Sequence, residues 1–316
     1  MKEQLESLSA ITINFGQGGT TIVNILLAFI MFGVALGIKI HTFKDVFTKP
    51  KSLITGLVLQ WIGLPAITTI LAILMNNWIT PMVALGMILV ASCPGGNISN
   101  FMSSFSKGNV ELSVSMTAIT SAFATFITPL NFFMWGNLYY RTVSISGDVP
   151  ELVIPFLPMF GQVLILLGIP IVLGMLFAKY FPKATQKITK PLQILSIVVF
   201  FGMVIISFAQ NFQIFIDNLF YIFIIVLIHN ACALGLGYFG ATLAKRPELD
   251  RRSLTIETGI QNSGLGLVLL FNHAIFPPEI WHHVYGGMLL VTAWWGVWHI
   301  ISGLTVSYIF RRKKVA

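Results

Sequence analysis

Long runs of apolar residues, each separated from the next by a short polar stretch, cover most of this 316-residue sequence. A transmembrane helix needs about 20 consecutive, mostly apolar residues, because the hydrocarbon core of a bilayer is about 30 Å thick. Runs of this kind lie near residues 22–40, 52–75, 80–106, 109–135, 151–178, 191–209, 215–244, 253–276 and 284–310. The pattern predicts an all-α membrane protein with about nine transmembrane helices, folded as a single polytopic domain over residues 1–316.

The positions of the basic residues predict how the chain lies in the membrane. Only 9% of the residues are charged and the net charge is +8, whereas about 25% are charged in soluble domains. All Lys and Arg except Lys2 and Arg141 lie at the ends of the odd-numbered runs or just after them. Cytoplasmic loops carry such an excess, which places the N-terminus outside and the C-terminus in the cytoplasm of a multi-pass inner-membrane protein. The positive charge therefore indicates orientation in a lipid bilayer rather than a nucleic-acid partner.

Two of the nine runs are interrupted by glycine and amide residues at mid-membrane depth. The third contains Cys-Pro-Gly-Gly-Asn-Ile-Ser-Asn at 93–100, and the eighth contains Glu-Thr-Gly-Ile-Gln-Asn-Ser-Gly at 257–264. Proline lacks an N–H and glycine leaves helical geometry easily, so we expect the third helix to unwind near Pro94–Gly96. The two runs are five apart and therefore cross the membrane in opposite directions. This order is typical of an inverted-repeat transporter with a binding site at the midplane.

Glu257 is the one acidic residue that lies well inside an apolar run. A carboxylate at the centre of a membrane helix costs about 3 kcal/mol on insertion scales, and no Lys or Arg within the runs can pair with it. Hydrogen bonds between helices are one way to hold it, but a bound cation or a proton is the favoured explanation.

Oxygen-bearing side chains accompany both interruptions. For any single serine or threonine, a hydrogen bond to its own helix is the simpler interpretation. Ser113 and Thr117 are four residues apart, however, and therefore share one helix face. The set that together with Glu257 would suit a hard cation comprises Gln60, Ser99, Asn100, Ser113, Thr117 and Gln261.

The sequence resembles the bile acid:sodium symporter family over most of its length. The resemblance is carried by Phe-Ile-Met-Phe-Gly-Val-Ala-Leu-Gly-Ile at 29–38, Gln60 with Pro65, the motif at 93–100, Gly-Asn-Val-Glu-Leu-Ser-Val-Ser-Met-Thr at 108–117, Thr-Ile-Glu-Thr-Gly-Ile-Gln-Asn-Ser-Gly-Leu at 255–265 and Val-Trp-His-Ile-Ile-Ser-Gly at 297–303. It implies two unwound, crossing helices in a core domain, with a smaller panel domain beside it. The panel would comprise the runs near 22–40, 151–178 and 191–209, and the core those near 52–135 and 215–310.

The resemblance also implies which residues bind ions and substrate. One sodium site would comprise Ser99, Asn100, Ser113, Thr117 and Glu257. A second would comprise Gln60, Glu257, Gln261 and the backbone carbonyls of Thr258 and Ile260. Substrate contacts are expected at Asn97, Asn262, Ser263 and His299. An anion is favoured as substrate, because half-helices that begin near Asn97 and Asn262 would direct free N–H groups into the cavity.

The sequence thus predicts a sodium-coupled symporter that imports an organic anion by alternating access. The substrate would be a bile acid-like molecule or a small carboxylate, with sodium as the coupling ion and no cofactor. A proton-coupled or uniporting carrier of the same fold is the closest alternative, and a receptor or channel is a third class. An intramembrane enzyme is disfavoured because the sequence has neither a Gly-x-Ser-x-Gly elbow nor a His-Glu-x-x-His pair.

Overall fold

The computed structural model describes residues 1–10, 25–26, 28–29, 31–33, 35–36, 50–144, 156–210, 212–272, 275–276 and 286–313. Every regular element within these ranges is a helix, which confirms the predicted all-α class. The first predicted span, near 22–40, lies largely outside the described residues. Within the described part, the helices long and apolar enough to cross a membrane are Pro50–Leu74, Val110–Ser144, Phe212–Leu243 and Gly286–Arg312.

The first of these long helices contains a π-helical turn. It is built from α4 (Pro50–Val58), the turn η3 (Leu59–Gly63) and α5 (Leu64–Leu74). Pro65 has no N–H to donate to the carbonyl of Trp61 four residues earlier, so regular α-helical bonding cannot continue there. Asn131 of α8 (Val110–Ser144) donates to that carbonyl instead, at 2.8 Å. Gln60 lies in this turn and is buried.

The third and eighth predicted spans are each broken into two half-helices, as their sequences predict. The third comprises α6 (Pro81–Ser92) and α7 (Ile98–Phe105), and the eighth comprises α13 (Glu248–Gly259) and α14 (Ser263–Leu270). The segments between the halves are therefore 93–97 and 260–262, which include the expected unwinding at Pro94–Gly96. The predicted break positions are confirmed.

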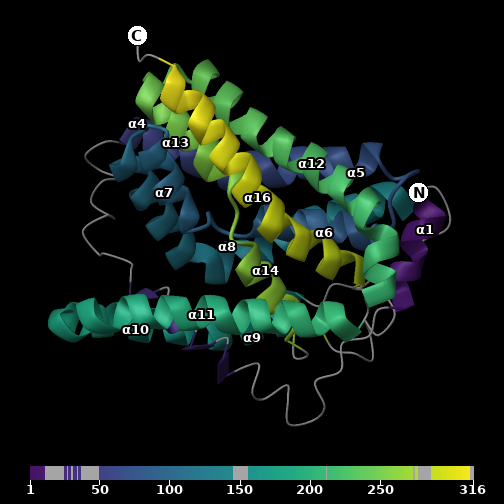
Figure 1. The fold of residues 1–316 in the computed structure, drawn as a ribbon, viewed down its shortest axis with the longest axis horizontal. Coiled ribbons are helices and arrows are strands. Elements are labelled where there is room, and N and C mark those ends of the chain that lie inside the picture. The colour runs from purple at the N-terminus through teal and green to yellow at the C-terminus, as the bar shows by residue number, and fades with distance from the viewer. Residues whose placement is uncertain are drawn as a thin grey trace.

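The remaining helices flank this centre (Figure 1). They are α1 (Lys2–Glu6) with the short 3₁₀ turn η1 (Ser7–Ala10), α9 (Phe156–Val163), the π-helical turn η4 (Leu164–Gly168), α10 (Ile169–Tyr180), α11 (Pro182–Gln210), α12 (Phe212–Leu243) and α16 (Gly286–Arg312). α9, α10 and α11 form a layer along one side of the other helices (Figure 1). α8 continues to Ser144, beyond its predicted end near 135.

The centre of the molecule is packed closely around α6. From Met82 to Ser92 all of its residues are buried, as expected of a helix that is apolar on every face. A Cβ added at Gly86 would lie 2.7 Å from the Cα of Met288 in α16, so glycine permits this close contact between the two helices. α6 is thus fixed against α16, and the break that follows α6 is held in the interior.

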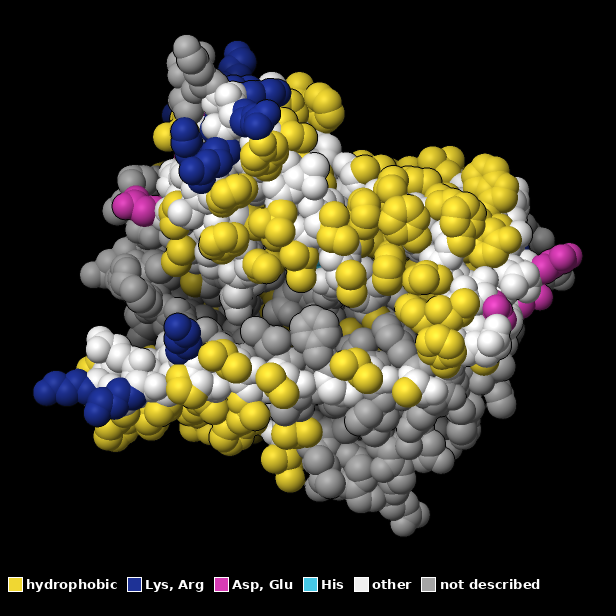
Figure 2. Space-filling view, viewed as in Figure 1, with side chains coloured by type: hydrophobic (Ala, Val, Ile, Leu, Met, Phe, Trp, Pro, Cys, Tyr) yellow, Lys and Arg dark blue, Asp and Glu magenta, His cyan; other side chains and the backbone are white. Residues whose placement is uncertain are grey.

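The surface has the distribution of a membrane protein. Large apolar side chains face outward, among them Leu157 at 76% exposure and Leu243 at 83%. Figure 2 shows such side chains over the middle of the molecule, with Lys and Arg gathered at the end that carries the C-terminus and at the same end of the α10 and α11 layer. The basic residues seen in this view thus lie toward one end of the molecule, which is the distribution expected if they all face the same side of a membrane.

Candidate functional site: the crossing of the two broken helices

The two breaks meet and pair with each other through their backbones. The amide of Gly96 donates to the carbonyl of Ile260 at 2.8 Å, and the amide of Asn262 donates to the carbonyl of Pro94 at 2.8 Å. Gly95 and Gln261 form an isolated antiparallel bridge between these bonds. Backbone groups freed from a helix inside a membrane need protein partners, because hydrocarbon supplies none. Each break thus satisfies the other, and four half-helix ends converge on one point.

Glu257 lies at this crossing, near the end of α13, and its side chain is fully buried. Ser99 of α7 and Ser113 of α8 both donate short hydrogen bonds to its Oε1. Thr117 Oγ1 lies 3.2 Å from each carboxylate oxygen. The structure therefore brings side chains from two other helices onto the carboxylate, and each of them is a residue that the sequence singled out.

Asn100 completes this group. Its Oδ1 lies 3.0 Å from Ser113 Oγ and 3.3 Å from Thr117 Oγ1. A hydroxyl group has one hydrogen, so neither side chain can donate to Asn100 and to Glu257 at once. The cluster consequently holds more oxygen acceptors than hydrogens. Oxygens that converge in this way suit a hard cation.

Hydrogen bonds from neutral hydroxyls do not neutralise a carboxylate. Arg252 is buried in the same helix, but its guanidinium donates to the backbone carbonyls of Ser106 and Lys313 and to Glu248. In the described part of the chain no salt bridge reaches Glu257. A buried charge without a partner is strongly unfavourable, so the geometry favours a bound cation or proton.

A second group of oxygens lies at the same crossing. Gln60 Nε2 donates to Gln261 Oε1 at 3.3 Å, and Gln261 Nε2 donates to the carbonyl of Thr258 at 2.9 Å. The carbonyl of Ile260 accepts the bond from Gly96, which leaves it one further lone pair. Gln60 Oε1 is buried and has no hydrogen-bond partner among the described residues. A buried amide oxygen is rarely left unbonded, so this atom is suited to a ligand.

The expected substrate residues are distributed around the same crossing. Asn97 and Asn262 immediately precede α7 and α14, as predicted. Asn262 accepts a hydrogen bond from the amide of Leu265 and so caps α14, whereas Asn97 is exposed and its side chain makes no cap bond. Ser263 and His299 are both buried. Ser263 also touches α16, because a Cβ at Gly296 would lie 2.8 Å from its hydroxyl.

Comparison with known proteins identifies the family. The model of the sodium bile acid symporter family matches residues 24–218. The chain belongs to the sodium bile acid symporter family. It is 30% identical to an uncharacterized sodium-dependent transporter, YocS, of Bacillus subtilis strain 168, over 86% of this chain and 82% of the relative. It is 28% identical to the ileal sodium/bile acid cotransporter of Mus musculus, over 92% of this chain and 80% of the relative.

A relative from plants extends the comparison. The chain is 27% identical to a probable chloroplastic sodium/metabolite cotransporter of Oryza sativa subsp. japonica, over 86% of this chain and 64% of that protein. The family and these relatives are transporters, which confirms that this family member is a membrane transporter and not an enzyme. The names of the family and of all three relatives include sodium.

Two residues at the crossing, Thr120 and Asn230, were not among those predicted from the sequence. Thr120 accepts a hydrogen bond from the amide of Gly95 at 3.3 Å, and Gly95 itself lies against Glu257. Asn230 of α12 donates to the carbonyl of Gly259, the last residue of α13, at 2.8 Å and accepts from Ser302. Asn230 could have been selected from the sequence, because a polar amide within an apolar span needs a hydrogen-bond partner. Thr120 offers no comparable signal, because hydroxyls in membrane helices commonly bond to their own backbone.

Proposed function

We propose that this protein is a sodium-coupled symporter that imports an organic anion by alternating access. The observation that carries the proposal is the buried carboxylate of Glu257 at the crossing, surrounded by uncharged oxygens from two other helices. Such a site is suited to a hard monovalent cation, and the names of the relatives include sodium. Coupling follows because the cation and the substrate would bind the same pair of broken helices.

The first sodium site would use the cluster around Glu257. Its hydroxyl lone pairs and the Asn100 amide oxygen are uncharged, so Glu257 would balance the charge of one ion. The ligands would be Ser99, Asn100, Ser113, Thr117 and Glu257. On binding, the serine hydroxyls would rotate so that their lone pairs, rather than their hydrogens, point toward the site of the sodium ion.

The second sodium site would use the unpaired oxygen of Gln60. Together with Glu257, the Gln261 side chain and the carbonyls of Thr258 and Ile260, it would enclose an ion beside the crossing. Support comes from the burial of Gln60 Oε1 with no hydrogen-bond partner in the part of the chain that the structure describes. Glu257 is common to both sets, so the two ions would bind interdependently.

The substrate would bind where α7 and α14 begin. Two helix N-termini at one place favour an anion, because their amides and dipoles attract negative charge. Asn97, Asn262, Ser263 and His299 would provide the polar contacts. The names of the relatives include bile acid and metabolite transport, and we propose a bile acid-like molecule or a small carboxylate as the substrate class.

The membrane topology belongs to the same proposal. The chain would cross the inner membrane nine times, with its N-terminus outside and its C-terminus in the cytoplasm. This topology would place the basic ends seen in Figure 2 in the cytoplasm. The layer of α9, α10 and α11 would belong to the panel, together with the span near 22–40. The remaining spans, over 52–135 and 215–310, would form the core as an inverted repeat.

The test is uptake by purified protein in proteoliposomes, with the ion gradient as the variable. Organic anions that stabilise the protein against heat only in the presence of sodium would first be selected as candidate substrates, because a ligand that binds only the folded protein raises its stability. Uptake should then require a sodium gradient. Uptake that persists in choline or potassium but collapses when the proton gradient is removed would replace sodium coupling by proton coupling.

A further inference from the structure

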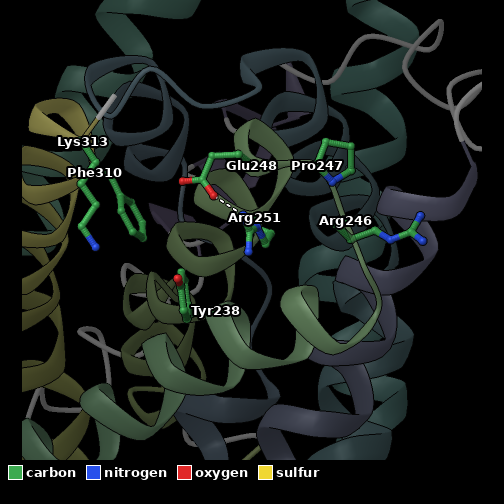
Figure 3. Close-up of a pocket in the computed structure, with 7 residues that line it drawn as sticks. All are labelled: Tyr238, Arg246, Pro247, Glu248, Arg251, Phe310 and Lys313. Carbon is green, nitrogen blue, oxygen red and sulfur yellow. Dashed lines mark hydrogen bonds and ion pairs between the residues drawn. The ribbon is translucent and has the colours of Figure 1, made fainter. Parts of the chain in front are cut away.

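An open pocket of about 480 Å³ lies at the end of the molecule that carries the C-terminus. It is formed by the C-terminal part of α12, the start of α13 and the end of α16 (Figure 3). The residues that line it are Tyr238, Arg246, Pro247, Glu248, Arg251, Phe310 and Lys313. None of them belongs to the crossing described above, so this pocket is a separate feature.

The lining carries more positive than negative charge. Three of its residues are basic and one is acidic, which leaves an excess of two positive charges. The one carboxylate, that of Glu248, is shared between Arg251 and Arg252. It therefore cannot also balance Arg246 and Lys313, and an anionic ligand would be attracted to the pocket.

Arg251 lines the pocket and belongs to the first turn of α13. The Nε of Arg251 is buried and makes no hydrogen bond within the described part of the chain. An incoming oxygen atom cannot reach this buried atom without movement of the side chain, so Arg251 would contact a ligand through the part of its side chain that lines the pocket. The start of α13 contributes as well, because Pro247 precedes the helix and provides no side-chain cap for its first amides. Guanidinium groups and free helix amides are the donors that bind phosphate.

Apolar surface adjoins the charged groups. Tyr238 and Phe310 stack in the pocket with ring centroids 6.2 Å apart. Outside it, Phe239 and Leu243 of α12 and Ile309 of α16 are exposed by 65%, 83% and 48%. A small anion such as free phosphate would make no contact with this exposed apolar surface, whereas the acyl chains of a lipid would lie along it. Basic clusters just beyond a membrane helix are known to bind anionic lipid head groups.

We propose that this pocket binds the phosphate group of an anionic glycerophospholipid. The phosphate would lie between Arg251 and Lys313, and the acyl chains would follow the exposed faces of α12 and α16. The lipid would come from the cytoplasmic leaflet if the proposed orientation is correct. Binding of a lipid phosphate here would require neither sodium coupling nor a particular transported anion.

The experiment measures lipid binding by native mass spectrometry of the full chain in a neutral detergent. Phosphatidylglycerol and phosphatidylcholine with the same acyl chains are compared. The double variant Arg251→Gln, Lys313→Gln should lose phosphatidylglycerol affinity by about tenfold or more, because each basic residue near a membrane surface contributes roughly a fivefold factor. The matched control is Lys183→Gln, Lys187→Gln, which removes two exposed charges at the start of α11 and should change affinity less than about twofold.

Three results would overturn the proposal. They are equal affinity for the two lipids, an equal loss of affinity in the control variant, and displacement of the lipid by inorganic phosphate alone, which would assign the pocket to free phosphate.

Because Arg251 pairs with Glu248, thermal unfolding is measured in parallel. If the double variant is unstable, Lys313→Gln alone must lower phosphatidylglycerol affinity by about fivefold, and an unchanged affinity would reject the site. Sodium-dependent stabilisation is recorded separately, so a failure of sodium coupling would not be mistaken for a failure of lipid binding.

Discussion

Ser99 and Glu257 are hydrogen bonded to each other although they lie 158 residues apart in the chain. Ser99 is in the first turn of α7 and Glu257 is in the last turn of α13. The bond joins the start of one half-helix to the end of another. It depends on the backbone pairing of the two breaks, because the bonds of Gly96 and Asn262 hold these half-helices together.

Replacement of Glu257 by glutamine should abolish the response to sodium but leave the fold intact. The amide keeps the shape of the carboxylate and removes its charge, so we expect sodium affinity to fall by about tenfold or more. Sodium-dependent thermal stabilisation and uptake measure the effect. Glu111→Gln, an exposed change at the start of α8, is the matched control. Wild-type sodium dependence in Glu257→Gln would be incompatible with the proposed ion sites.

Substitution of Gly95 by alanine should damage the site through steric overlap. The new Cβ would lie 2.8 Å from Glu257 Oε2 and 3.1 Å from Gln60 Nε2. Overpacking of this kind costs about 1–3 kcal/mol, and displacement of these two side chains would weaken sodium binding. Thermal unfolding with and without sodium gives both quantities. Gly161→Ala is the control, because no described residue lies within 4 Å of its added Cβ. Similar losses in both variants would refute the steric explanation.

The asparagines before the two half-helices should affect the substrate more than sodium. Asn97→Ala and Asn262→Ala are expected to weaken substrate affinity several-fold, and His299→Ala to a lesser degree. Asn262 also caps α14, so its loss costs about 1 kcal/mol of stability. Asn262→Ser keeps a capping oxygen and should restore stability without restoring affinity. Separate titrations of sodium and substrate check this, and a lost sodium response with unchanged substrate affinity would reverse the assignment.

Asn230 should contribute to stability through the end of α13. It donates to the carbonyl of Gly259 and accepts from Ser302 of α16. Interhelical hydrogen bonds in membranes contribute about 0.6 kcal/mol on average and up to about 1.7 kcal/mol. Asn230→Ala should therefore lower the free energy of unfolding by an amount within or above this range. A double-mutant cycle with Ser302→Ala measures their coupling. Thr305→Ala, which removes an exposed bond within α16, should have little effect, and additive changes at Asn230 and Ser302 would exclude a direct interaction.

Transport should be electrogenic and sigmoidal in sodium if both sets of oxygens bind ions. Two sodium ions with one monovalent anion would move one net positive charge. Each elementary charge is worth about 2.3 kcal/mol per 100 mV, so an inside-negative potential should raise accumulation more than about tenfold per 100 mV. Vesicles with a potassium and valinomycin clamp provide the measurement. Two results would rule out the two-site scheme for a monovalent substrate. One is a flux that does not change with the imposed potential, and the other is a stoichiometry of one sodium per substrate with a non-sigmoidal dependence of uptake on sodium concentration.

The sequence by itself determined the features that depend on local composition. Apolar runs long enough for a bilayer predicted the helices, and proline and glycine at 93–96 predicted where the third one unwinds. Glu257 stood out because a carboxylate is costly among apolar neighbours. The breaks and the burial of Glu257 are confirmed, since backbone chemistry and desolvation act on each residue where it stands in the chain.

Only the tertiary structure decided which distant groups meet. No spacing along the chain indicates that Gly95 pairs with Gln261, or that Asn230 holds the end of α13, because these contacts join separate helices. The turn that buries Gln60 depends on a bond from Asn131 of another helix. The lipid pocket likewise exists only because α12, α13 and α16 end together. Local sequence determines which groups need partners, and the packing of the helices determines which partners they find.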